Sequence, residues 1–210
     1  MIVNALFVSL LLGGAYLLMF SYIMALVGLA VVLFAYGYLF LLFLRVVQQT
    51  ALGEATAPST PDMAGIGEAF VALLRMLVVL FVWAGPATIA YYAAGERTTV
   101  AFWVLALIGA AFLPMSLLAV ATFESLRGVN PMPLVQMIAR VPGQYALCCA
   151  VFYIVIGARY AVCDIETITG TAALDVVIKE VAVVYSLYVA GRVLGSLHAS
   201  NSLRFGWLRA

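Results

Sequence analysis

Long apolar runs, separated by short polar stretches, dominate the pattern of this chain. Between Gly37 and Pro86, one apolar run ends at Arg45, a loop rich in Thr, Ala, Gly and Pro follows, and another run begins after Glu68. Each run approaches or exceeds the roughly 20 residues with which a helix crosses the hydrocarbon of a bilayer. The pattern therefore predicts membrane spans joined by loops.

The first apolar run, from Ile2 to Val47, contains no charged residue before Arg45. As a single helix it would be about 69 Å long, more than twice the roughly 30 Å of hydrocarbon. We therefore predict two spans with a turn near Phe20 to Ala25. A cleaved signal peptide is the alternative for the first span, but the segment has no basic start and no convincing cleavage site.

Four further apolar runs complete the prediction. Gly85 and Pro86 interrupt the third span and Pro114 lies near the middle of the fourth, so we expect kinks in both. The predicted fold is all-α: a polytopic membrane helix bundle of about six transmembrane helices, arranged as three hairpins in a single domain over residues 1–210. The spans are 2–20, 25–46, 69–94, 100–123, 144–163 and 174–197.

Two short amphipathic segments precede the third and fifth spans, and the loops before them are similar in composition. Gly53, Pro58 and Pro61 in one loop correspond to Gly128, Pro131 and Pro133 in the other. An internal duplication would explain this similarity. A shared loop composition explains it equally, because Gly and Pro interrupt helices in every polytopic protein.

Composition and charge indicate a membrane protein and not a soluble one. Apolar residues make up 67% of the chain and charged residues only 9%, whereas about a quarter of a soluble domain is charged. The net charge of +1 gives no concentrated basic surface, so no nucleic-acid partner is predicted. With six spans, most Arg residues fall on the side of the termini, and the positive-inside rule places both termini in the cytoplasm. These residues are Arg45, Arg75, Arg127, Arg140, Arg192, Arg204 and Arg209.

The chain is poor in residues that perform chemistry. His198 is the single histidine, and Cys148 and Cys149 are helical neighbours that point about 100° apart. No phosphate-binding loop and no Ser/His/Asp set is apparent. We predict no catalytic residue, no metal site and no intrinsic cofactor, and therefore no enzyme.

Charged residues inside predicted spans are functional candidates, because a charge at the bilayer centre costs about 2.5–3.5 kcal/mol or more. One interpretation is that the Arg side chains reach the headgroups and that an acid and a base four residues apart pair on one helix. The other is a polar pathway for an ion or substrate. The candidates are Arg75, Arg159, Asp175, Lys179 and Arg192.

Gly191, Gly195 and Ala199 form a small-residue ridge on the sixth span, which allows close helix contact. The ridge could pack against another helix of the same chain or against another subunit. Aromatic residues are abundant within the spans; core packing explains most of them, and contact with lipid or pigment would use the same residues.

Five short segments of the chain share a pattern with other membrane proteins: Gly37-Tyr38-Leu39 with Arg45, the loop into Asp62 and Glu68, Arg140 to Tyr145, Arg192 to Gly195, and Phe205-Gly206-Trp207. In these segments the chain resembles a family of uncharacterised bacterial multi-spanning membrane proteins that is classed as a domain of unknown function. The similarity covers about residues 36–207, and Ala64-Gly65 stands where that family has an aromatic residue. The resemblance implies the bacterial inner membrane and no catalytic residue.

Two functions remain. The first is a non-catalytic accessory, scaffold or assembly subunit that contacts lipid and other membrane protein subunits. The second is a small transporter or lipid-handling protein, for which kinked spans are typical. A polar cavity at mid-membrane lined by Arg75 or Lys179 would favour the second.

Overall fold

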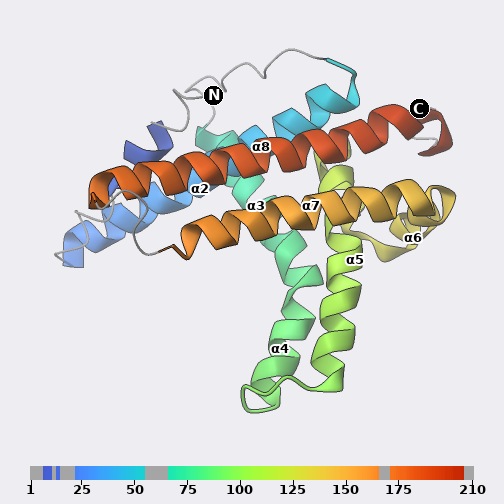
Figure 1. Cartoon of the computed structure of the whole chain (residues 1–210), viewed down its shortest axis with the longest axis horizontal. Coiled ribbons are helices and arrows are strands. Elements are labelled where there is room, and N and C mark those ends of the chain that lie inside the picture. Colours follow the sequence, from blue (N-terminus) through green and yellow to red (C-terminus); the bar gives the residue numbers. More distant parts are fainter. Residues whose placement is uncertain (1–6, 11–12, 15–21, 55–65, 166–170, 206–210) are drawn as a thin grey trace.

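Helices are the only regular elements that the computed structural model contains within residues 7–10, 13–14, 22–54, 66–165 and 171–205, the part of the chain it describes. The predicted all-α class is therefore confirmed. The labelled helices are α2 (Tyr22–Ala51), α3 (Ile66–Trp83), α4 (Gly85–Ala93), α5 (Val100–Phe123), the 3-10 helix η2 (Leu126–Val129), α6 (Pro131–Arg140), α7 (Pro142–Cys163) and α8 (Ala172–Phe205) (Figure 1).

Three described helices are long and apolar enough to cross a membrane, or four if α3 and α4 form one broken span. They are Ala25–Ala51, Val100–Phe123 and Pro142–Cys163. Much of the predicted span 2–20 lies outside the described residues. The predicted span 174–197 falls within α8, whose 34 residues include Asp175, Lys179, Glu180 and Arg192 and which is not among these candidates. Six spans are thus more than the described helices display.

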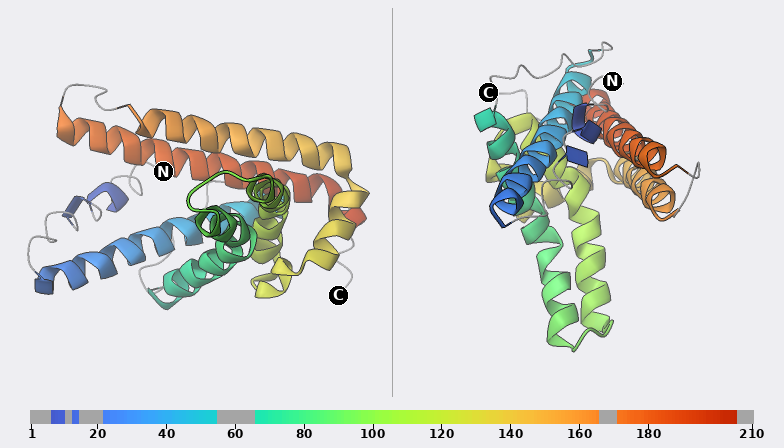
Figure 2. Two further views of the ribbon diagram at one scale, coloured as in Figure 1. Left: turned by 90° about the horizontal axis from the view of Figure 1, so that it is seen from below. Right: turned by 90° about the vertical axis from the view of Figure 1, so that its left-hand side faces the viewer.

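Long helices form one part of the molecule and a hairpin projects from it. In Figures 1 and 2, α7 and α8 run side by side in opposite directions, and α2 lies along the other side of α8. The hairpin of α4 and the first half of α5 extends away from these helices. We call α4, the turn 94–99 and residues 100–108 of α5 the arm. The arm joins two of the predicted spans, 69–94 and 100–123, as a hairpin. The predicted arrangement of all six spans as three hairpins is not confirmed.

The arm begins at a bend, because α3 and α4 meet at an angle of 51°. Pro86 supplies no N–H to the carbonyl four residues earlier, so the chain turns where the predicted kink lies, at Gly85 and Pro86. The neighbouring Trp83 fixes the direction of the bend. Its ring stacks on Phe112 of α5 at 4.8 Å between centroids, and its backbone carbonyl lies directly against Gly109.

Local sequence explains where the other helices begin and end. The Thr99 side chain accepts a hydrogen bond from the Phe102 N–H and caps the start of α5. Glu124, at a φ of 50°, ends the same helix in the left-handed conformation. Asn130 caps α6 in the same way as Thr99 caps α5, and Pro142 stands in the first turn of α7.

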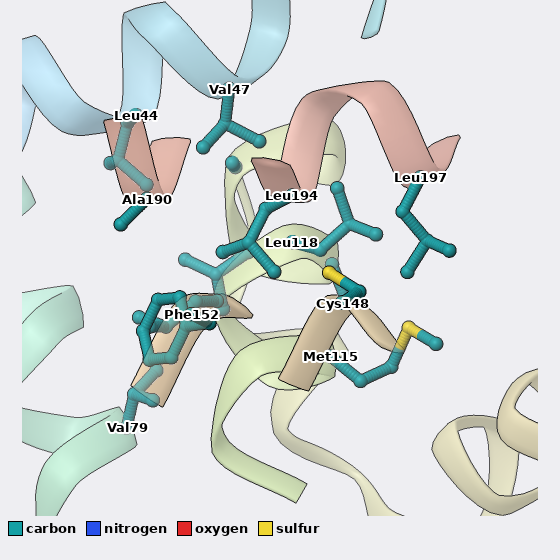
Figure 3. Close-up of a cluster of buried hydrophobic side chains, with 14 of the residues drawn as sticks. Leu44, Val47, Val79, Met115, Leu118, Cys148, Phe152, Ala190, Leu194 and Leu197 are labelled. Atoms are coloured by element: carbon teal, nitrogen blue, oxygen red, sulfur yellow. The ribbon is translucent and has the colours of Figure 1, made fainter. Parts of the chain in front are cut away.

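The second half of α5 lies at the centre of the hydrophobic core. All residues from Pro114 to Ala121 are buried. Side chains from four other helices surround it (Figure 3): Leu44 and Val47 of α2, Val79 of α3, Cys148 and Phe152 of α7, and Ala190, Leu194 and Leu197 of α8.

Two tyrosines of α7 hold this half of α5 in place. Pro114 has no N–H, so the carbonyl of Ala110 cannot accept the usual helical hydrogen bond from residue 114. The Tyr153 hydroxyl donates to this carbonyl at 2.6 Å, and the Tyr145 hydroxyl donates to the carbonyl of Ala111. The Ala110 carbonyl, which Pro114 leaves without a backbone donor, is thus paired by a side chain of α7. In apolar surroundings an unpaired carbonyl would cost free energy.

Candidate functional site

A pocket of about 420 Å³ lies between α2, α3 and α5, and all the charged side chains of these three helices line it. We call it the polar pocket. Its wall combines four ionisable groups and one amide with an apolar floor. The polar members are Arg45, Gln48, Glu68, Arg75 and Glu124, and the others are Leu41, Leu44, Gly67, Val71, Ala72, Val120 and Ala121.

Polar contacts from α2 tie the wall of the polar pocket together. Arg45 Nη2 lies 3.1 Å from Glu68 Oε2 and joins α2 to α3 in an ion pair. One turn later, Gln48 Nε2 donates to Glu124 Oε1 at 2.9 Å and to the Ala121 carbonyl at 2.7 Å. Consecutive turns of α2 therefore bind both neighbouring helices.

Arg75 differs from the other polar residues of the pocket. It extends from the second turn of α3 after Glu68 and lines the same cavity. Among the described residues, its guanidinium forms no ion pair with either carboxylate of the pocket, although that of Arg45 does. The pocket therefore contains one arginine engaged by the protein and one that is available to a ligand.

The polar pocket lies where three predicted membrane spans end. The predicted spans 25–46, 69–94 and 100–123 each have one end among its lining residues or next to them. Sequence reasoning singled out Arg75 but placed Gln48 and Glu124 in loops without a role. The signal that could have found them is the recurrence of a charged or amide residue just beyond the end of three spans.

The small-residue ridge of α8 faces α2. A Cβ atom on Gly195 would lie 2.5 Å from Thr50 Cβ and 2.7 Å from the Val47 carbonyl oxygen, and one on Gly191 would lie 3.0 Å from Val46 Cγ1. Ala199 is exposed. The two glycines thus lie at an intramolecular helix contact, and Ala199 lies beyond it.

The other charged candidates belong to α7 and α8 and are not brought together with Arg75. Arg192 donates to the Tyr188 hydroxyl at 2.9 Å, lies over that ring, and reaches the Glu54 carbonyl at 3.5 Å. Arg159 lies over the ring of Tyr160, 5.5 Å from its centroid. Asp175 is buried and Lys179 is half-buried.

Residues with potential metal or thiol chemistry are dispersed. Cys148 lies in the core, Cys149 and Cys163 are half-buried, and His198 is buried on α8. In the described ranges, no three side chains of His, Cys, Asp or Glu lie close enough together to hold a metal ion. The polar pocket, by contrast, brings four ionisable side chains and one amide to the same cavity.

Comparisons with protein-family models, with curated proteins and with solved structures gave no match. The resemblance to a family of unknown function stays a prediction, and function has to be argued from the chain itself.

Proposed function

We propose that the protein is a non-catalytic accessory or scaffold subunit that packs against a larger membrane assembly through its arm. The observation that supports this proposal is the exposed apolar surface of the arm. Its large side chains point away from the protein's own core: Ile89, Tyr92, Val100, Trp103, Val104, Leu107 and Ile108 are all exposed.

The shape of the arm supports contact with a protein. The arm stands apart from the long helices (Figure 1), and within it α4 packs against the first half of α5. Aromatic rings, which are enriched in protein interfaces, gather on it: Tyr91 lies 5.9 Å from Phe102, and Phe102 lies 5.2 Å from Trp103. Because its two helices are already formed, an apolar hairpin of this kind offers contact area at a lower cost in conformational entropy than an unfolded segment would.

Gentle solubilisation followed by size separation and mass spectrometry tests the proposal. We expect a stoichiometric second membrane protein with the native chain, and its loss in the double variant Trp103→Ala/Leu107→Ala. The matched control is Leu147→Ala/Ile154→Ala on α7, since both of these side chains are equally well exposed. Retention of the partner by the arm variant would contradict the role of the arm.

A small transporter or lipid-handling protein is the second candidate. The polar pocket, which Arg75 lines, would suit lipid handling. It lies at the ends of three predicted spans, however, and is not the mid-membrane cavity that a transport pathway would need. A monodisperse monomer without a stoichiometric partner, together with substrate flux in liposomes made from this protein alone, would support this function and overturn the first.

The bacterial inner membrane is part of the proposal because of the family resemblance described above, and the cytoplasmic position of both termini rests on the distribution of Arg residues. We expect a Cys introduced at Asn130 to be protected from an impermeant thiol reagent in intact cells and labelled after lysis. Labelling of this Cys in intact cells would show that the topology is the reverse of the one proposed.

A further inference from the structure

We propose that the polar pocket binds the headgroup of a zwitterionic phospholipid that carries a primary amine, with Arg75 contacting the phosphate and Glu124 contacting the ammonium. The inference concerns binding alone. It is independent of the scaffold function, since a subunit of an assembly and a lipid-handling protein can both hold a lipid.

The charges of the polar pocket support this choice. Arg45 and Glu68 neutralise each other at 3.1 Å, which leaves Arg75 and Glu124 as one positive and one negative group in the same cavity. A phosphoethanolamine headgroup likewise has one phosphate and one ammonium. An anionic lipid would match Arg75 and be repelled by Glu124, because like charges disfavour each other.

The chemistry of the two groups refines the match. An Arg guanidinium can donate two parallel hydrogen bonds to a phosphate. The Glu124 carboxylate accepts one hydrogen bond from Gln48, and a carboxylate has further lone pairs to offer. A primary ammonium has three N–H donors for these lone pairs, as the ammonium of Lys has. A quaternary choline ammonium has no N–H and cannot make the bond.

The apolar floor of the polar pocket and its place at the ends of predicted spans suit a lipid better than a soluble metabolite. Leu41, Leu44, Val71 and Val120 line the same cavity as the charges. An amphiphile can place its headgroup among the charged side chains and its glycerol and acyl carbons along these apolar ones. The ends of three predicted spans meet here, which is the level of the lipid headgroups.

Lipid binding to the delipidated full chain in detergent tests the inference. The probes are phosphatidylethanolamine, phosphatidylcholine and phosphatidylglycerol of identical acyl chains, and soluble phosphoethanolamine, with affinity measured by native mass spectrometry. We expect phosphatidylethanolamine to bind about tenfold more tightly than phosphatidylcholine, as a charge-assisted hydrogen bond of about 1.4 kcal/mol would give. Soluble phosphoethanolamine should bind much more weakly than the lipid.

Two variants separate the roles. Glu124→Gln keeps an acceptor for Gln48 and should abolish the preference for phosphatidylethanolamine over phosphatidylcholine. Arg75→Gln should weaken the binding of every phospholipid about tenfold, and Arg75→Lys should restore part of it. The control is Arg97→Gln, because Arg97 is exposed in the turn of the arm and far along the chain from the pocket. If Arg75→Gln does not fold, Glu124→Gln decides the matter alone.

Equal affinity for phosphatidylethanolamine and phosphatidylcholine in the native chain would overturn the inference, as would a preference that survives Glu124→Gln. A preference for phosphatidylglycerol would indicate a site for anionic lipid, and tight binding of soluble phosphoethanolamine would indicate a soluble ligand; either result contradicts the inference. If the protein purifies without a stoichiometric partner, that result contradicts the scaffold function. The measured phospholipid affinities would not change, so the two proposals can fail separately.

Discussion

Both halves of α5 are apolar in sequence, and their surroundings are opposite. Leu107, in the first half, is 68% exposed, whereas Leu118, three turns later, is fully buried. The first half belongs to the arm, and the second half is surrounded by α2, α3, α7 and α8. Hydropathy alone therefore does not tell which part of this helix its own chain covers.

Small residues and paired polar groups distinguish the buried half. Gly109 admits the Trp83 carbonyl, and the carbonyl that Pro114 leaves without a donor receives the Tyr153 hydroxyl. Neither feature, a glycine against a backbone carbonyl or a carbonyl paired with a tyrosine hydroxyl, links the described residues of the exposed half to the core helices. Close packing and satisfied polar groups, which drive helix association in membranes, thus mark the internal interface.

The largest expected effect comes from the same substitution in each half. Leu118→Ala leaves a cavity in the core and should lower the free energy of unfolding by about 2–5 kcal/mol. Leu107→Ala should change it by less than about 0.5 kcal/mol. Reversible unfolding in mixed micelles measures both, and similar values for the pair would contradict the contrast between the halves.

Glycine substitutions sharpen the contrast at the point where the halves meet. Gly109→Ala forces the Trp83 backbone away and should cost about 1–3 kcal/mol, the usual range for overpacking. Gly157→Ala on α7 is the control, because a Cβ there meets no atom within 4 Å. A thermal midpoint for Gly109→Ala equal to that of the control would show that α3 and α5 do not cross closely.

A second glycine contact, between α8 and α2, can be tested in the same way. Gly195→Leu should lower folded yield, because even a Cβ atom would lie 2.5 Å from Thr50 Cβ of α2. The expected destabilisation is about 1–3 kcal/mol. Unchanged melting in detergent and an unchanged size profile would show that the ridge makes no such contact.

An effect of similar size is expected at Pro114. Tyr153→Phe leaves the Ala110 carbonyl without its donor and should cost about 1–3 kcal/mol. The double variant Tyr153→Phe/Pro114→Ala should recover part of this loss, because an alanine in place of the proline supplies a backbone N–H to that carbonyl. A double-mutant cycle measures the coupling, and additivity of the two single changes would contradict the proposed hydrogen bond.

The smallest effect is expected in the polar pocket. Glu68→Gln removes the ion pair with Arg45, but the Glu68 side chain is 64% exposed. Such a pair contributes at most about 1 kcal/mol. A loss comparable to that of Leu118→Ala would mean that the polar pocket is a structural centre of the fold.

Sequence reasoning found the helices better than their arrangement. Runs of apolar residues gave α5 with the same ends as the structure, and Gly85-Pro86 located the bend. The angle of the arm could not be predicted from the sequence, because it depends on contacts of Trp83 in α3 with Gly109 and Phe112 in α5. The candidate site was found in part: Arg75 stood out as a charge in a span, whereas Gln48 and Glu124 gain their meaning only when α2 and α5 lie side by side.

Photo-crosslinking in intact membranes tests most directly the central claim that the arm is the surface for a partner. A photoreactive residue at position 107 is compared with one at position 154 of α7, because Leu107 and Ile154 are both 68% exposed. The account predicts one discrete protein adduct from position 107 and lipid adducts alone from position 154. Lipid adducts alone from both positions would contradict it.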